Sequence, residues 1–297
     1  MTLHIRSFYG VAIAVLVLSL IASLTHFKYE QLVSEFEDQQ AKKLLTISKH
    51  FEYRVAEREL ILNIASEQII KNYLLERPEA ISALLDKNLA MRPDLAGFLV
   101  TTASGSYIAS SSNVTKEGTP NLLRHPKTKE GFQRALETDK MAIGKNYYFK
   151  PLNTWVAPFR KAIRIDGKVI AMISTGMNIR NIRNEIDVTL ADQTVTSIVS
   201  DHGYYRIFSS NDDQVSFEKL YSEPVAKTTI NEITDHFQQR YHYNLQGIKE
   251  NLAKTPLTAL AHNGFGNHVL ISLMYEPKYA YWVTVETPYH RDLFKTV

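Results

Sequence analysis

The stretch with the clearest secondary-structure pattern in this chain is Thr154-Trp-Val-Ala-Pro-Phe-Arg-Lys-Ala-Ile-Arg-Ile-Asp-Gly-Lys-Val-Ile-Ala-Met-Ile-Ser-Thr-Gly-Met177. Two runs rich in β-branched and aromatic residues, 154–165 and 169–177, meet at the pair Asp166-Gly167. Asp-Gly favours a two-residue hairpin turn, because both turn positions take a positive φ. The stretch therefore predicts two long antiparallel strands.

Further strand-like runs lie on both sides of this hairpin, and helical patterns separate them. Before the hairpin, strands are expected at 95–101, 107–111 and 141–149, with a helix over 125–137. After it, a linking helix is expected over 178–187, helical or irregular chain over 214–252, and strands at 194–200, 204–209, 257–261, 267–275 and 281–286. The same order occurs twice: a hairpin, a helical excursion and three more strands. This pattern predicts an α+β fold of two modules in series, each with an antiparallel sheet.

An uncharged apolar segment lies near the N-terminus, where residues 7–25 form a run of nineteen without a formal charge. As a helix with a rise of about 1.5 Å per residue, the run is roughly 28 Å long, which matches the hydrocarbon core of a bilayer. A cleaved signal peptide is the alternative, but Ala22-Ser-Leu-Thr25 is a poor cleavage site. We expect an uncleaved transmembrane helix over 7–26, behind a cytoplasmic tail of residues 1–6.

A long helix is expected directly after this segment, because residues 27–73 contain neither Gly nor Pro. Apolar residues such as Leu44, Ile47, Phe51 and Val55 recur at steps of three and four. Arg77-Pro78 ends the pattern, and a second helix is expected over 79–90, so that 27–90 forms a stalk with a second helix. Such length is unusual for a helix of one small domain. The stalk is therefore expected to pack on its own body and on a partner copy, as a homodimer.

Composition excludes several classes of protein. The chain has 34 Lys and Arg against 31 Asp and Glu, a formal charge of +3, so no nucleic-acid partner is expected. It has no Cys, which removes disulfides, thiolate metal sites and cysteine nucleophiles. The ten His form no His-Glu-x-x-His motif, and neither a Gly-x-Ser-x-Gly motif nor a cofactor fingerprint occurs. No metal, no cofactor and no catalytic residue are expected.

Three stretches resemble a known family. They are Tyr147-Tyr-Phe-Lys-Pro-Leu-Asn-Thr-Trp155, Ile165-Asp-Gly-Lys-Val-Ile-Ala-Met-Ile-Ser-Thr-Gly-Met-Asn-Ile179 and Tyr281-Trp-Val-Thr-Val-Glu-Thr-Pro288. With the anchor and the long helix, they resemble the double-Cache extracytoplasmic sensor domain of bacterial transmembrane receptors, a tandem of PAS-like modules. The resemblance implies a membrane-distal module over 91–178 and a membrane-proximal module over 179–290. Residues 291–297 would begin the link to a second membrane helix.

The resemblance also implies where a ligand binds. In members that bind amino acids, a Tyr, an Arg, a Trp and an Asp hold the ligand, and the Tyr and Trp positions match Tyr148 and Trp155. Asn153 and Asn178 stand where Arg and Asp are expected, so both charged partners of a zwitterion are replaced by amides, which argues against an α-amino acid. Arg160 or Arg164 could supply a cation instead. Tyr147 is a further candidate, and the alternative for all three aromatic residues is simple core packing.

Together these features predict the ligand-sensing region of a receptor in the bacterial inner membrane, with its body in the periplasm and a small extracytoplasmic ligand. The chain is expected to be the front part of a longer protein, whose output domain is a diguanylate cyclase by preference, or a histidine kinase or chemoreceptor signalling domain. The alternative function is a membrane-anchored periplasmic module that binds another protein. A third, an anchored hydrolase, would need a nucleophile beside a base.

Overall fold

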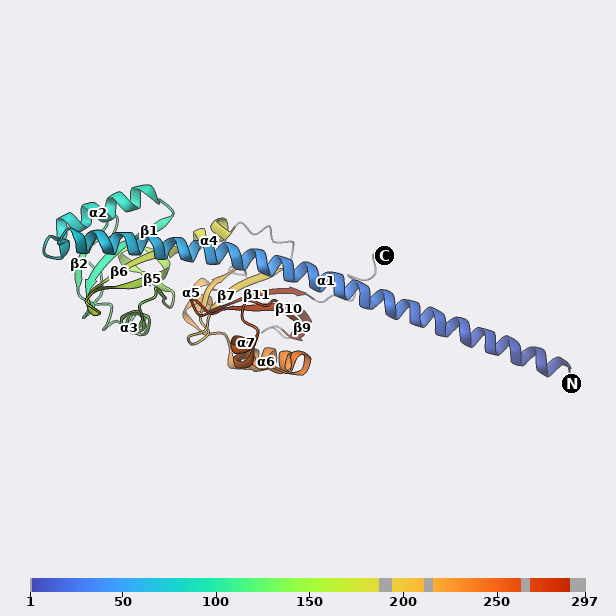
Figure 1. The fold of residues 1–297 in the computed structure, drawn as a ribbon. Helices are drawn as coiled ribbons and strands as arrows, with labels where there is room; N and C mark the ends of the chain where they lie inside the picture. The colour runs from blue at the N-terminus through green and yellow to red at the C-terminus, as the bar shows by residue number, and fades with distance from the viewer. Residues whose placement is uncertain (1, 187–193, 211–215, 263–267, 289–297) are drawn as a thin grey trace.

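The computed structural model describes residues 2–186, 194–210, 216–262 and 268–288. Its first element is one unbroken helix, α1 (Thr2–Lys71), which runs along the whole body and projects beyond it at the N-terminal end (Figure 1). The segments expected as a membrane helix and a stalk are therefore one continuous helix of 70 residues, roughly 105 Å long. Over the residues that the structure describes, no helix combines the length and the apolar character needed to cross a membrane.

The long helix ends at Lys71, a few residues before the expected stop at Arg77-Pro78. Tyr73 adopts a left-handed conformation with a φ of 51°, which reverses the chain. A single 3-10 turn, Leu74–Glu76, then leads into α2 (Pro78–Met91). Pro78 begins this second helix, because a proline in the first turn loses no intrahelical hydrogen bond.

The first module is a six-stranded antiparallel sheet in the order β2-β1-β6-β5-β3, with β4 also paired to β5. Its strands are β1 (Leu95–Thr102), β2 (Tyr107–Ser110), β3 (Ala142–Ile143), β4 (Tyr147–Phe149), β5 (Thr154–Ile165) and β6 (Lys168–Asn178). The predicted β5–β6 hairpin is confirmed, because Asp166 and Gly167 have φ values of 49° and 76°. The single strand expected over 141–149 is two short ones, because the chain leaves the sheet at Asn146, whose amide group donates to the carbonyl of Arg206 at 3.1 Å.

The second module is a five-stranded antiparallel sheet in the order β8-β7-β11-β10-β9. Its strands are β7 (Val195–Ser200), β8 (Arg206–Ser209), β9 (Leu257–His262), β10 (His268–Glu276) and β11 (Tyr281–Pro288). The helix α4 (Ile179–Ile186) lies between the sheets in sequence, and α5 (Phe217–Ser222), α6 (Lys227–Tyr241) and α7 (Leu245–Asn251) follow β8. If the short strand β4 is set aside and each sheet is counted from its own first strand, both sheets have the same order. This confirms the α+β fold with two antiparallel sheets in tandem.

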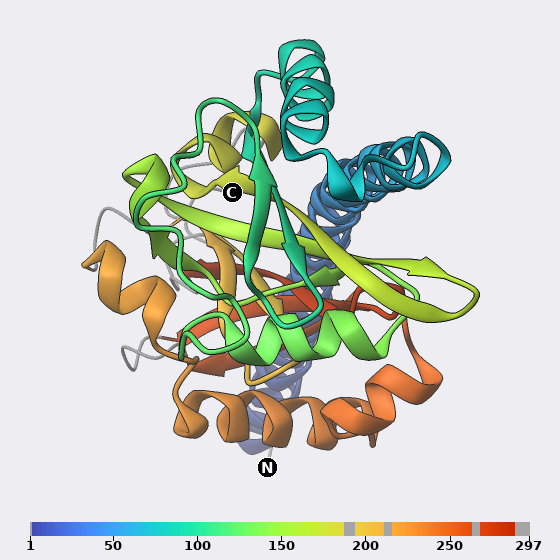
Figure 2. The same ribbon diagram turned by 90° about the vertical axis from the view of Figure 1, so that its left-hand side faces the viewer.

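Each sheet is covered by α1 on one face and by helices of its own module on the other (Figures 1 and 2). The helix α3 (Lys129–Glu137) covers the first sheet, and α6 and α7 cover the second. One apolar core follows α1 through both modules and includes Leu44, Phe51, Leu62 and Ile69. Burial of each such side chain contributes about 1.5–3 kcal/mol. Both modules therefore pack on the same helix through one continuous apolar core.

Glu59 of α1 lies where the two modules meet. Its carboxylate accepts hydrogen bonds from the Met141 backbone N–H of the first module at 3.3 Å and from the Tyr279 hydroxyl of the second at 2.9 Å. The Lys278 ammonium group lies 2.9 Å away. Burial opposes the charged form of this carboxyl, but the hydrogen bonds from Lys278, Tyr279 and Met141 outweigh it and lower the pKa of Glu59. One carboxylate thus joins three parts of the fold.

Candidate ligand-binding pocket

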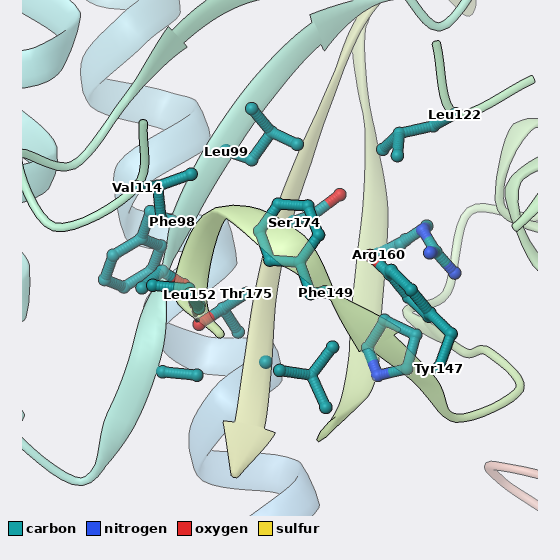
Figure 3. A pocket seen from close by; sticks show the side chains of 15 residues that line it. Phe98, Leu99, Val114, Leu122, Tyr147, Phe149, Leu152, Arg160, Ser174 and Thr175 are labelled. Atoms are coloured by element: carbon teal, nitrogen blue, oxygen red, sulfur yellow. Dashed lines mark hydrogen bonds between the residues drawn. The ribbon is translucent and has the colours of Figure 1, made fainter. Parts of the chain in front are cut away.

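A small pocket lies in the first module, on the face of the sheet opposite α1. Figure 3 shows its lining side chains, among them Phe98, Leu99, Leu122, Phe149 and Arg160. The lining residues are Ala96, Gly97, Phe98, Leu99, Val114, Leu122, Tyr147, Phe149, Leu152, Val156, Pro158, Arg160, Ser174, Thr175 and Gly176. The free volume is about 30 Å³, which is room for one or two waters. A larger ligand requires the lining to move apart.

Arg160 is the only charged residue of this lining, and its side chain is 1% exposed. Among the described residues, none of its three guanidinium nitrogens has a hydrogen-bond partner of good geometry, although the Tyr147 hydroxyl lies near enough to favour the charged guanidinium. The group lies 5.9 Å from the centre of the Tyr147 ring. Burial lowers the pKa of Arg160, and the neighbouring Tyr147 side chain opposes that shift. An unpaired buried cation is costly, and a bound anion would remove that cost.

The alternation of side chains along a strand places Arg160 on the face of β5 that lines the pocket. In β5, Val156, Pro158 and Arg160 face the pocket, and Ala157 and Phe159 belong to the core beside α1. The same rule separates the two neighbouring tyrosines of β4, because Tyr147 is buried at the pocket and the next residue points away.

Two hydroxyl groups complete the polar part of the pocket. The hydroxyl of Ser174 is buried and has no hydrogen-bond partner among the described residues. The hydroxyl of Thr175 donates to the carbonyl of Gly97 at 2.9 Å. An apolar enclosure with one guanidinium and one free hydroxyl has donors for a carboxylate or another small oxyanion. It offers no carboxylate that could pair with an ammonium group.

Arg164, the other candidate cation, has partners outside the pocket. One of its nitrogens donates to the carbonyl of Leu136 at 2.6 Å, and another to the carbonyl of Gly167 at 3.1 Å. A third lies 3.0 Å from the carboxylate of Asp139. The carbonyl of Leu136 is in the last turn of α3, so Arg164 satisfies a helix end. This leaves Arg160 as the cation of the site.

Tyr148, Asn153 and Trp155 form a separate group outside this pocket. Tyr148 is 44% exposed, and its hydroxyl donates to the side-chain oxygen of Asn153, whose backbone is left-handed with a φ of 49°. The Trp155 ring lies 6.4 Å from the Tyr148 ring and 5.9 Å from the ring of Phe217 in α5. Trp155 therefore contacts the second module. Trp155 packs partly buried against the core and does not line the first-module pocket.

Asn178 lies at the end of β6, away from the pocket lining. Its side-chain oxygen accepts a hydrogen bond from the backbone N–H of Arg180 at 3.1 Å, at the start of α4. This is the geometry of a helix N-cap. Of the six predicted site residues, the structure thus brings Tyr147 and Arg160 together at the pocket. Tyr148, Asn153, Trp155 and Asn178 do not join them.

The glycine at position 144 and the hydroxyl of Ser174 are site features that sequence reasoning missed. A Cβ at Gly144 would collide with the guanidinium group of Arg160, so this glycine makes space for the buried cation. Neither has a signal in the sequence, because Ser174 becomes part of the site only through its pairing with Arg160 between β6 and β5. Within the described residues, no group of three or more His, Asp or Glu could hold a metal ion.

Comparison with known proteins gives a fold-level match. No protein-family model matches the sequence, and neither does the sequence of any curated protein. The extracellular domain assigned to histidine kinase soHK1S-Z6 is 13% identical, with a TM-score of 0.63 over 91% of this chain and 100% of that chain. The ligand-binding domain of the Pseudomonas fluorescens chemoreceptor CtaA, in complex with L-isoleucine, is 11% identical, with a TM-score of 0.60 over 91% and 99%.

The ligand-binding domain of the Campylobacter jejuni chemoreceptor Tlp3, in complex with L-norvaline, matches with a TM-score of 0.55 and 14% identity, over 90% of this chain and 95% of that chain. At such identities the likeness concerns the fold. All three are ligand-binding or extracellular domains of chemoreceptors or of a histidine kinase. The chain therefore has the fold of the double-Cache sensory domains of bacterial chemoreceptors and histidine kinases, as the resemblance in its sequence predicts.

Proposed function

We propose that this protein is the extracytoplasmic ligand-sensing region of a bacterial transmembrane signalling receptor. The fold shared with chemoreceptor and histidine kinase sensory domains supports this function. The pocket of the first module is the ligand site in this proposal. Ligand entry would move the strands and loops that line the pocket apart. Because α1 packs on the other face of the same sheet, this movement would shift α1 relative to the sheet.

The ligand that suits this pocket is a small anion without an ammonium group. The single observation that carries this choice is the buried, unpaired guanidinium of Arg160. The neighbours Tlp3 and CtaA were solved with L-norvaline and L-isoleucine, which carry both charges. Here the lining contains no Asp or Glu. A carboxylate held by Arg160, with Ser174 as a second donor, fits the chemistry of the lining.

The body of the receptor would lie in the periplasm and its anchor in the inner membrane. Large apolar side chains of α1 are exposed here, namely Ile13, Val15, Leu16, Val17, Leu18, Leu20, Ile21, Leu24 and Phe27, with Leu16 at 70%. In the proposed arrangement, residues 1–6 are cytoplasmic, 7–26 cross the membrane, and 27–90 form the stalk and second helix. Residues 91–178 and 179–290 are the membrane-distal and membrane-proximal modules. Residues 291–297 lead to a second membrane helix and an output domain, with a diguanylate cyclase preferred over a kinase or chemoreceptor domain.

The receptor would act as a homodimer through α1. Tyr53, Leu60 and Ile64 are 65%, 57% and 45% exposed, although they lie on a helix whose other side is buried in the body. Their spacing of seven and four residues places them on one face. A second copy of this helix would cover the stripe, as in a coiled coil.

A thermal-shift screen of the full chain in detergent micelles tests the ligand class. The panel comprises monocarboxylates, dicarboxylates, phosphate, amino acids and amines. We expect a carboxylate to raise the melting temperature of the wild type and of Lys161→Met, a neighbour in β5 that does not line the pocket. Arg160→Met is expected to abolish the response. An amine as the stabilising compound would contradict the proposal. No response to any compound would favour the alternative function, a periplasmic protein-binding module.

A further inference from the structure

A second cavity lies between the two modules and is separate from the pocket of the first. Its volume is about 120 Å³, four times that of the first-module pocket. The start of α3 and the 144–145 turn line it on one side. The turn between β7 and β8, with the beginning of β8, lines it on the other. We refer to this cavity as the junction cleft.

The lining of the junction cleft is strongly cationic. The first module contributes Lys127, Arg134 and Lys145, and the second contributes Arg206. Glu130 is the only carboxylate among the lining residues, so cations exceed anions by three. Glu130 lies 3.7 Å from Arg134, at the outer limit of an ion pair. The cluster therefore lacks the negative charge that would balance it.

Contacts with neighbouring groups place three of the cationic side chains, and the Lys127 ammonium group lies 6.0 Å from the centre of the Trp155 ring. The Lys145 ammonium group lies 3.7 Å from the centre of the Tyr205 ring, across the boundary between the modules. Arg134 donates to the carbonyl of Ile143, and its charge, together with burial, lowers the pKa of His202 on the opposite wall. Burial also lowers the pKa of Arg206, and the neighbouring Glu286 and Tyr221 oppose that shift. Like charges are thus gathered in a partly desolvated place.

The buried guanidinium of Arg160 lies directly behind one wall of the junction cleft. A Cβ at Gly131, which lines the cleft, would be 3.0 Å from a guanidinium nitrogen of Arg160. That nitrogen has no hydrogen-bond partner among the described residues. A further uncompensated positive charge therefore adds to the potential inside the cleft, where low surrounding polarity strengthens it.

We propose that the junction cleft is a second anion-binding site, which takes a small oxyanion with two or more negative charges and bridges the two modules. A divalent anion matches the excess of cations better than a monovalent one. Its oxygens would accept from Lys127, Arg134 and Lys145 on one side and from Arg206 on the other. Neither the ligand of the first-module pocket nor its identity enters this proposal.

Bridging has a structural consequence. The direct link beside the cleft is Asn146, whose buried amide group donates to the carbonyls of Arg206 and Ile207 at 3.1 and 2.9 Å. In this proposal, an empty cleft leaves positive charges of both modules uncompensated next to this link. An anion that contacts groups of both modules would hold them together at their junction. The occupancy of the cleft would therefore set how firmly the first module is attached to the second.

Calorimetric titration of the full chain with inorganic phosphate and with succinate, at constant ionic strength, tests the site. The test variant is K127Q/K145Q. The control is K129Q/K140Q, which removes the same charge from two exposed lysines nearby that do not line the cleft. We expect saturable binding by the wild type and the control, and at least tenfold weaker binding by K127Q/K145Q. Arg160→Met removes only a charge behind the cleft wall, and it should therefore weaken binding less than K127Q/K145Q does.

Three results would overturn the proposal. One is the absence of saturable binding of both probes to the wild type. Another is equal weakening in the test and control variants, which would indicate general screening of surface charge. The third is binding that Arg160→Met abolishes and K127Q/K145Q preserves, because the probe would then occupy the first-module pocket. Failure of the proposed ligand class in the first-module pocket would leave this test unaffected.

Discussion

Arg160 is a buried residue whose desolvation destabilises the ligand-free protein and would favour the binding of an anion. Its guanidinium group is buried in apolar surroundings, next to Tyr147, without a hydrogen-bond partner among the described residues. An unsatisfied buried polar group costs about 1–3 kcal/mol, and a charged one more. A ligand anion that pairs with the guanidinium group would remove this cost, and the gain would appear as binding free energy. The penalty in the empty protein and the affinity of the pocket thus come from one side chain.

This view predicts that Arg160→Met makes the ligand-free protein more stable. Methionine fills a similar volume without a charge, so we expect the melting temperature to rise by several degrees, equivalent to about 1–3 kcal/mol. Thermal unfolding followed by circular dichroism checks this. Arg164→Met is the matched control, and it should destabilise the protein because the carbonyl of Leu136 loses its donor. A larger loss of stability in Arg160→Met than in Arg164→Met would show that Arg160 has a structural role.

The helix α1 is the element that joins the sheets, and its residue Glu59 contacts both modules through one carboxylate. Its pKa is held below its usual range, so it binds fewer protons in the folded state than in the unfolded state near pH 4. The stability that it contributes is complete above its unfolded pKa of about 4.3. That stability is lost as the pH falls through the lower, folded pKa.

We therefore expect Glu59→Gln to unfold with a weaker dependence on acid than the wild type. The free energy of unfolding between pH 7 and pH 3 checks this, since the slope reports the difference in bound protons. Glu67→Gln provides the control, because Glu67 and its partner Lys71 are both largely exposed. Identical acid slopes in the wild type and Glu59→Gln would contradict the assignment.

The exposed face of α1 leads to a prediction about assembly. Leu60→Glu with Ile64→Glu places two carboxylates on the proposed dimer stripe, where they would repel those of a partner copy. Sedimentation velocity in detergent should show the monomer in place of the dimer, with unchanged thermal stability. Leu260→Glu, at an exposed leucine of β9, should leave the dimer intact. An unaltered dimer in the stripe variant would exclude this face of α1 as the interface.

At the scale of the whole molecule, the repeated strand order and the tight turn at Asp166-Gly167 could be predicted, because both depend on local patterns. The choice between Arg160 and Arg164 could not. They lie four residues apart in β5, about 13 Å along the strand, and only the placement of α3 decides which of them reaches the pocket. The neighbours Tyr147 and Tyr148 must face opposite sides of a strand, yet their sequence does not say which side holds the ligand.

Features that join the modules were also beyond sequence reasoning. Asn146 breaks an expected strand because its partners are carbonyls about sixty residues away. The junction cleft combines Lys127 and Arg134 with Arg206, and no motif connects these positions. Such sites depend on how the two modules pack against each other. The hydrophobic periodicity of the sequence predicts the strands and helices of each module but not this packing.

A crystal structure of the protein with the stabilising carboxylate from the ligand screen is the most direct test of the account. The predicted result is a carboxylate oxygen about 2.7–2.9 Å from a guanidinium nitrogen of Arg160, inside an enlarged first-module pocket. The opposite result is a ligand bound elsewhere in the molecule while Arg160 stays buried and unpaired.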